Sequence, residues 1–279
     1  ISEFLAYGEA FRGGVNVTSC DLDDDGDQEI VTGAGYTGGP HVRVFSSTGT
    51  PTGVSFFAYA DHFRGGVNVA CGGLDDNGTS EIITGAGVTG GPHIKVFNAT
   101  GVLIDEAFSG SASDATGVLV TLGDTDGDGA SEILASPAAY AHPSVTIFDW
   151  EQARLKYQQA FSTGATQTHG SPIAAFDIDN NGTDEIAVSE GAFGSSVFDV
   201  IGPVGNLVSS VETSMLTASA SLLPARLKDD ANNHLLVLAG STASVADTGD
   251  KLIIVDLSEQ RLTAYSNGVP INSFLVSSG

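Results

Sequence analysis

An aspartate-rich turn of nine residues recurs four times along the chain, and each copy runs directly into a hydrophobic stretch. The isoleucine that follows each turn sets the spacing, because successive copies of it lie 52, 51 and 53 residues apart. A motif that returns about every fifty residues indicates an array of similar structural units. A fifth, weaker copy ends at Leu235. The four clear copies are DLDDDGDQE at 21–29, GLDDNGTSE at 73–81, DTDGDGASE at 124–132 and DIDNNGTDE at 177–185.

Short hydrophobic stretches with period-two alternation surround each turn, which is typical of β-strands. The first unit contains VNV at 15–17, EIVTGAG at 29–35, HVRVF at 41–45 and VSFFAY at 54–59. The second unit repeats all four, and later units keep the pattern with more substitutions. Four short strands in each unit predict an all-β fold, a β-propeller of four-stranded antiparallel blades. We expect four clear blades and a degenerate fifth, either as a complete ring or as part of a larger one.

Two longer repeats carry a resemblance to a known family. FRGGVNV occurs at 11–17 and 63–69, and TGAGYTGGPHVRVF at 32–45 returns as TGAGVTGGPHIKVF at 84–97. These segments resemble FG-GAP and VCBS-type repeats, the integrin-like propeller blades that carry calcium loops. The resemblance is strongest in the first two units and implies a propeller domain over residues 1–242. Propellers of this family usually have seven blades, so it also implies a smaller ring or further sequence.

Each turn places oxygen-bearing side chains at positions 1, 3, 5 and 9, with glycine at the bend, and Ca²⁺ prefers such oxygen ligands. The first turn holds six acidic residues within nine, and carboxylates about 4 Å apart repel by roughly 1–4 kcal/mol per pair. We therefore expect structural Ca²⁺ in the first, third and fourth turns. The second should be weak or empty, because Gly73 replaces its first aspartate. The candidate ligands are Asp21, Asp23, Asp25, Glu29, Asp75, Asn77, Glu81, Asp124, Asp126, Asp128, Glu132, Asp177, Asp179, Asn181 and Glu185.

The fifth turn differs in its chemistry, because Arg226 and Lys228 occupy its first and third positions. We interpret these residues as an internal cation that replaces the metal by pairing with Asp229 or Asp230. In the other turns position 9 also begins the second strand. A bound ion would therefore tie the first hairpin of each blade together.

The formal net charge of −24 disfavours nucleic acid and anionic lipid as partners. No apolar run reaches the length of a membrane span, and no signal-peptide pattern is present. We accordingly expect no membrane insertion, and a monomer.

The two cysteines, Cys20 and Cys71, fall in the same strand of successive units but are offset by one position. Because neighbouring residues of a strand point to opposite faces, we expect two buried thiols and no disulfide. His41 and His93 follow Gly-Gly-Pro at equivalent places, which favours a structural role at a blade edge over metal binding. No catalytic constellation stands out in the propeller.

The last stretch, residues 251–279, departs from the repeat. It is either the outer strands of the fifth blade or, by resemblance, the start of an L,D-transpeptidase catalytic domain. The run from Ile253 to Leu262 and the closing Val276 to Gly279 carry that resemblance. It implies a cysteine nucleophile and a histidine in a full-length protein, beyond this chain.

Two functions remain open at this point. The first is an extracytoplasmic, calcium-stabilised propeller that scaffolds or targets a peptidoglycan-remodelling L,D-transpeptidase. The alternative is a non-enzymatic adhesion propeller of the cell surface. The expected partner is cell-wall glycan, peptidoglycan or a surface protein.

Overall fold

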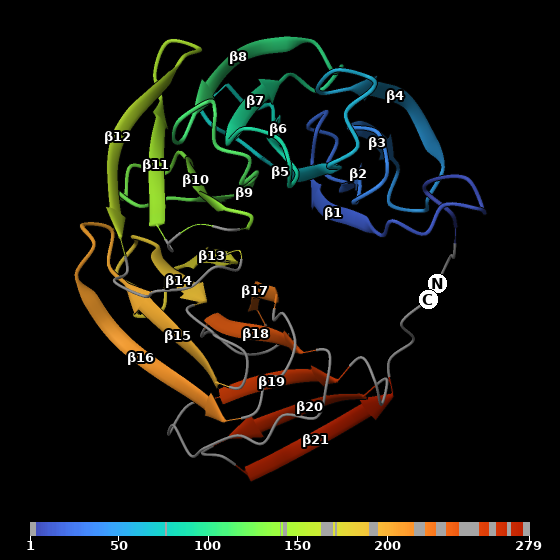
Figure 1. Cartoon of the computed structure of the whole chain (residues 1–279). Helices are drawn as coiled ribbons and strands as arrows, with labels where there is room; N and C mark the ends of the chain where they lie inside the picture. The colour runs from blue at the N-terminus through green and yellow to red at the C-terminus, as the bar shows by residue number, and fades with distance from the viewer. Residues whose placement is uncertain are drawn as a thin grey trace. The chain divides into compact units, whose positions relative to one another are not determined.

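The computed structural model of the chain describes a protein built from β-strands (Figure 1). Within the described residues, strands are the only regular secondary structure, and no helix is long and apolar enough to cross a membrane. The all-β fold is therefore confirmed. The described residues are 4–75, 77–139, 141, 144–162, 170, 172–189, 195–214, 221–226, 233–239, 251–256, 261–266 and 269–275.

The strands form five sheets, and the first four are four-stranded and antiparallel with their strands in chain order. The first sheet contains β1 (Val15–Cys20), β2 (Glu29–Ala34), β3 (His41–Phe45) and β4 (Pro51–Phe57). The second contains β5 (Val67–Gly72), β6 (Glu81–Ala86), β7 (His93–Phe97) and β8 (Leu103–Phe108). The third contains β9 (Val118–Gly123), β10 (Glu132–Pro137), β11 (Ser144–Trp150) and β12 (Leu155–Ser162). The fourth contains β13 (Ile173–Phe176), β14 (Glu185–Ser189), β15 (Ser195–Ile201) and β16 (Leu207–Ser214).

The fifth sheet contains five strands, β17 (Ser221–Arg226), β18 (Asn233–Ala239), β19 (Lys251–Asp256), β20 (Arg261–Ser266) and β21 (Val269–Leu275). Its strands β18 and β19 run parallel, whereas a standard blade would continue antiparallel. A parallel pair requires a crossover connection, and the residues between these strands lie outside the described part of the chain. Of the C-terminal strands, β19 thus pairs directly with β18, and a domain boundary between 242 and 251 stays a prediction.

Two compact units make up the chain. The first contains the first three sheets, and the second contains the last two together with Asp124–Gly127. Inside the first unit, β1 lies against β5 and β5 lies against β9 (Figure 1).

The hydrophobic core of the first unit lies between successive sheets. One cluster joins the first and second sheets through Val31, Val44 and Val67, which are almost fully buried. A second cluster joins the second and third sheets through Ile83 and Val118. The second strand of a sheet is covered on both faces, which explains its almost continuous apolar sequence.

Glycine in the repeated TGAG segment permits this close packing. A Cβ atom on Gly33 would lie 2.4 Å from the main-chain oxygen of Val67 in the next sheet. The same approach recurs one sheet later, where a Cβ on Gly85 would lie 2.3 Å from the Val118 oxygen. Asn16 donates a hydrogen bond to that Val67 oxygen at 2.7 Å. The sheets therefore meet through a repeated joint of close main-chain contact.

The expectation of two free thiols is wrong, because Cys20 and Cys71 form a disulfide with their Cα atoms 5.9 Å apart. The two cysteines do belong to opposite faces of equivalent strands, as the offset predicted. However, successive sheets pack with opposite faces together: one face of the first sheet contacts the other face of the second sheet. An offset of one position therefore brings the two side chains together across the joint.

Candidate cation sites

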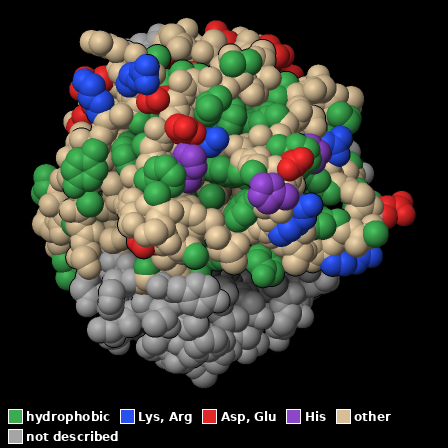
Figure 2. Space-filling model, turned by 45° about the horizontal axis from the view of Figure 1, so that its top comes forward, with side chains coloured by type: hydrophobic (Ala, Val, Ile, Leu, Met, Phe, Trp, Pro, Cys, Tyr) green, Lys and Arg blue, Asp and Glu red, His purple; other side chains and the backbone are tan. Residues whose placement is uncertain are grey.

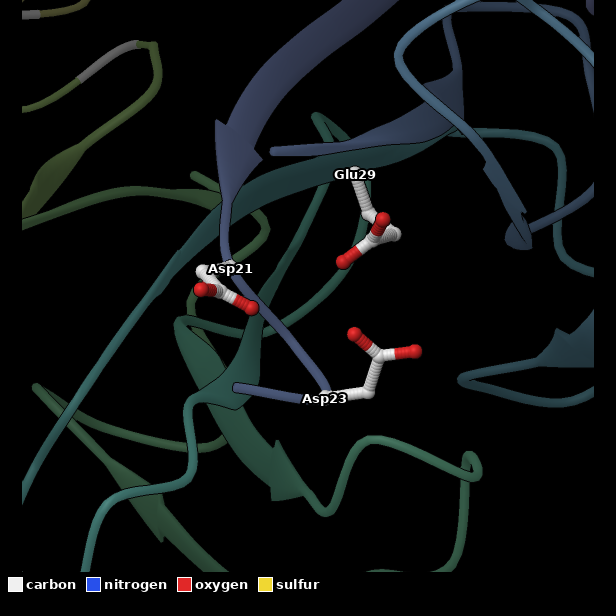
Figure 3. Close-up of side chains that lie close together, drawn as sticks. All are labelled: Asp21, Asp23 and Glu29. Carbon is white, nitrogen blue, oxygen red and sulfur yellow. The ribbon is translucent and has the colours of Figure 1, made fainter. Parts of the chain in front are cut away.

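The first aspartate turn connects β1 to β2, and the register of this hairpin places Cys20 opposite Glu29. Carboxylate oxygens of Asp21, Asp23 and Glu29 lie within 4.8 Å of one another. Figure 3 shows the three carboxylates turned toward a shared space, two from the strand ends and one from the turn. No described ion pair with lysine, arginine or histidine involves these three side chains.

Hydrogen bonds to the main chain fix the shape of this turn. The two carboxylate oxygens of Asp21 accept from the N–H groups of Asp25 at 3.2 Å and Gly26 at 2.9 Å. Gly26 has a φ of 90°, the left-handed region that glycine adopts without strain. These hydrogen bonds fix the position of the Asp21 carboxylate where the chain leaves β1.

The fourth turn repeats this arrangement. Asp177 accepts from Asn181 at 3.0 Å and from Gly182 at 2.9 Å, and its carboxylate lies near those of Asp179 and Glu185. The third turn gathers Asp124, Asp126 and Glu132 in the same way. Three of the four predicted clusters therefore exist among the described residues, each made by positions 1, 3 and 9.

The residue at position 5 makes the same hydrogen bond in all four turns: its side-chain oxygen accepts from the main-chain N–H of position 7. In the first turn Asp25 accepts from Asp27 at 2.8 Å, and in the third turn Asp128 accepts from Ala130 at 2.9 Å. Neither aspartate belongs to the three-carboxylate clusters. A ligand role for position 5 stays a prediction. The amides Asn77 and Asn181 make the same bond to Thr79 and Thr183, each at 2.8 Å.

The glutamate at position 9 also does more than the sequence indicated. It is buried in all four turns, with 2 to 8% of its surface exposed. Glu29 accepts a hydrogen bond from the N–H of Leu22 at 3.0 Å, and Glu81 accepts from Leu74 at 3.2 Å. Because the second turn keeps this bond without a carboxylate cluster, the glutamate closes the hairpin on its own.

The second turn lacks a carboxylate where the others have their first aspartate. A Cβ on Gly73 would meet nothing closer than 3.7 Å, so open space takes the place of that side chain. Burial raises the pKa of Glu81, and the charge of Asp75 raises it further. Asp75, Asn77 and Glu81 therefore provide a reduced donor set, in line with the expectation of a weak or empty site.

Asp184 is a residue that the sequence analysis missed. Its carboxylate accepts a hydrogen bond from the N–H of Asp124 at 3.0 Å, and its own N–H donates to the main-chain oxygen of Asp124 at 2.6 Å. Burial is the main cause that raises the pKa of Asp184. The other turns have Gln28, Ser80 or Ser131 at position 8. The carboxylate of the fourth turn at this position was the signal in the sequence that could have identified Asp184.

The pKa of the glutamate in the fourth turn is raised in the same way. Burial raises the pKa of Glu185, and the neighbouring charges of Asp179 and Asp177 add to the shift. A bound cation favours the ionised forms of such carboxylates. The fifth turn, with its proposed internal cation, lies largely outside the described residues.

The two repeated histidines pack as structural residues. The ring of His93 stacks on Phe108 with centroids 4.2 Å apart, and His41 lies 4.8 Å from Phe57. His93 Nε2 lies 3.2 Å from a carboxylate oxygen of Glu106. Figure 2 shows a face of the molecule on which histidine side chains lie beside hydrophobic, acidic and basic side chains.

No family profile matches the chain, and no curated protein matches it in sequence. Solved structures do match. The rhamnogalacturonan lyase YesW gives a TM-score of 0.58 at 16% identity, covering 94% of this chain and 58% of its own. The exotype rhamnogalacturonan lyase YesX gives 0.55 at 14%, covering 93% and 55%. A rhamnogalacturonan lyase of Bacillus licheniformis gives 0.55 at 15%, covering 94% and 50%.

These matches show a shared fold, and the chain spans between half and three fifths of each lyase. The resemblances to FG-GAP repeats and to an L,D-transpeptidase receive no support from any of the comparisons. The chain is thus similar in fold, over nearly its whole length, to part of three rhamnogalacturonan lyases.

Proposed function

We propose that this chain is a calcium-stabilised β-propeller module that binds carbohydrate outside the cytoplasm. The observation that carries the proposal is the repeated cluster of two aspartates and a buried glutamate at the same place in three sheets. The fold neighbours supply the carbohydrate part of the proposal, because all three are named for a polysaccharide.

The propeller arrangement is supported by the packing inside the first unit. The first strands of its three sheets contact one another in sequence, and each sheet then continues outward through its second, third and fourth strands. The same joint of glycine and asparagine connects each sheet to the next. Repeated sheets that contact one another through their first strands are the arrangement expected of propeller blades.

Calcium fits the donor set better than other common ions. Carboxylate oxygens are hard ligands, and the turn leaves main-chain carbonyls and water to complete a coordination shell of six to eight. Asp21, Asp23 and Glu29 would hold the ion in the first turn, and the matching residues would do so in the third and fourth. The ion would neutralise close carboxylates and tie the turn to both strands of the hairpin. Its role is structural.

An extracytoplasmic location agrees with the disulfide, because such bonds persist mainly in oxidising compartments. The site for carbohydrate is proposed at exposed aromatic side chains of the first two sheets. Tyr36 is 56% exposed, Phe57 52% and Phe108 43%, and the two phenylalanine rings lie against those of His41 and His93. Such rings offer flat apolar area, and binding pockets combine apolar and aromatic area with a few hydrogen-bonding groups.

Binding to a panel of polysaccharides tests the proposal. We would measure affinity by calorimetry for pectic, neutral and peptidoglycan fragments, with calcium and with EDTA. Tyr36→Ser should weaken binding of the preferred glycan several-fold, whereas Tyr157→Ser, at an exposed ring of β12, should leave it unchanged. A folded, calcium-loaded protein that bound no glycan would overturn the carbohydrate function. If it bound a surface protein instead, the adhesion alternative would replace it.

A further inference from the structure

The disulfide and the first cation turn share their supporting residues. Cys20 is the last residue of β1, Asp21 follows it directly, and Glu29 is its partner across the hairpin. One end of the disulfide is therefore attached where the first and last proposed ligands leave the sheet. The other end, Cys71, belongs to β5 in the second sheet.

This arrangement is particular to the first turn. The residues opposite the position-9 glutamate in the other hairpins are Gly72, Gly123 and Phe176, none of which is able to form a disulfide. The fourth turn has a similar carboxylate cluster and nearly the same hydrogen bonds. The chain thus contains a natural control for the effect of the disulfide on a cation site.

We propose that the Cys20–Cys71 disulfide sets the calcium affinity of the first turn, so that its reduction weakens this site alone. The inference rests on the proposed calcium binding. Asp21 and Glu29 must keep their carboxylates close together although the like charges repel. The disulfide holds the end of β1 against the second sheet, so part of the ordering required by the ion is already present. Reduction releases this restraint at the base of the turn.

The redox step is a thiol–disulfide exchange with a dithiol such as dithiothreitol. The S–S bond accepts two electrons and two protons, and Cys20 and Cys71 become thiols. The dithiol loses the same electrons and protons and closes into a cyclic disulfide. No other reactant takes part.

Thermodynamic linkage makes the coupling reciprocal. If oxidation raises calcium affinity by some factor, calcium raises the equilibrium constant for forming the disulfide by the same factor. The coupling is therefore measurable in the unmodified protein, without relying on cysteine variants that fail to fold. Linked sites commonly change one another about 5–150-fold.

The experiment equilibrates the whole chain in dithiothreitol redox buffers, with calcium or with EDTA. Alkylation and mass spectrometry then give the fraction of reduced Cys20 and Cys71. We expect calcium to shift the dithiol-to-disulfide ratio at half reduction by about tenfold. Asp23→Asn should remove this shift, because Asp23 belongs to the first-turn cluster and no described hydrogen bond of the hairpin involves its side chain. Asp179→Asn, at the same position of the fourth turn, should retain it.

The outcomes separate this inference from the proposed function. If calcium neither bound nor raised the melting temperature, both would be overturned. If calcium bound and stabilised the protein but the half-reduction ratio stayed constant, only the disulfide coupling would be wrong. Equal loss of the shift in Asp179→Asn would show a global effect of stability and would also overturn the local coupling.

Discussion

The hydroxyl oxygen of Tyr59 lies 2.7 Å from the main-chain oxygen of His93, although Tyr59 follows the last strand of the first sheet and His93 begins a strand of the second. The same hydroxyl contacts the main-chain oxygen of Thr84 at 3.1 Å. Tyr7 repeats the bond one unit earlier, where it donates to the His41 oxygen at 2.8 Å. Burial raises the pKa of Tyr59, so the group remains a neutral donor. A tyrosine thus links the segment preceding the first sheet to that sheet, and another does the same for the second sheet.

Tyr59→Phe should therefore lower the free energy of unfolding by about 1–2 kcal/mol, because a buried acceptor loses its donor while the ring is kept. Urea denaturation monitored by circular dichroism measures the change. Tyr36→Phe is the matched control, since Tyr36 is exposed and its hydroxyl has water in both states. Equal effects of the two substitutions would show that the contact between Tyr59 and His93 adds nothing.

Gly33→Ala should destabilise the first unit although alanine is the less flexible residue in the unfolded chain. The added methyl would lie 2.4 Å from the Val67 oxygen, which is main chain and unable to move aside without separating two sheets. Overpacking of this kind costs about 1–3 kcal/mol or more, which exceeds the entropic gain. Thermal and urea unfolding measure the loss.

Gly8→Ala is the control for this substitution, because nothing lies within 4 Å of the added methyl. It should leave stability unchanged or raise it by up to about 1 kcal/mol, the entropic gain of alanine over glycine. A Gly33→Ala protein as stable as the Gly8→Ala protein would contradict the close joint between the sheets.

Much of this architecture is readable from the sequence because it repeats. Alternation around 15–17 and 41–45 located β1 and β3, and the aspartate turns located the hairpins with their carboxylates at positions 1, 3 and 9. Period-two alternation reports which face of a sheet a residue occupies. It does not report which faces of two sheets meet, and for that reason Cys20 and Cys71 were assigned the wrong state.

Hydrogen bonds within the turns were equally beyond the sequence. A carboxylate at position 9 reads as a ligand, yet Glu29 also closes the hairpin through the N–H of Leu22. The hydrogen bond from the Asp124 N–H to the Asp184 carboxylate depends on two turns approaching each other in space. The parallel pairing of β18 with β19 was not predicted either, although both strands are continuous apolar runs, which are common in parallel sheets.

Mild acid should destabilise the protein through His41 and His93, whose rings pack against phenylalanines. Burial is the main cause that lowers the pKa of His93, while the charge of Glu106 opposes it and that of Lys95 adds to it. Burial and then the charge of Arg43 lower the pKa of His41. Below the ordinary value near 6.5, the unfolded chain binds more protons than the folded chain. Stability is therefore fully present above that value and is lost as the pH falls through it toward the folded pKa.

Urea denaturation at pH 7.5, 6.5 and 5.5 measures this slope. His93→Gln should flatten it, whereas His62→Gln, at a ring that is largely exposed, should not. An acid slope that survived in the His41→Gln, His93→Gln double variant would assign the effect to other groups.

Removal of calcium should lower the melting temperature by several degrees for each occupied turn. An ion at one hundred times its dissociation constant stabilises the folded state by about 2.7 kcal/mol, which corresponds to roughly 5–10 °C in a chain of this size. Asp177→Asn should remove about one such step, because it weakens a cluster residue of the fourth turn. Asp75→Asn should change little, since the second turn already lacks its first carboxylate.

Calorimetry in calcium, magnesium and EDTA makes the measurement. Magnesium should stabilise the protein less, because it demands a stricter octahedral coordination. A melting curve that EDTA left unchanged would rule out structural calcium, and a loss in Asp75→Asn equal to that in Asp177→Asn would show that the second turn binds as well as the fourth.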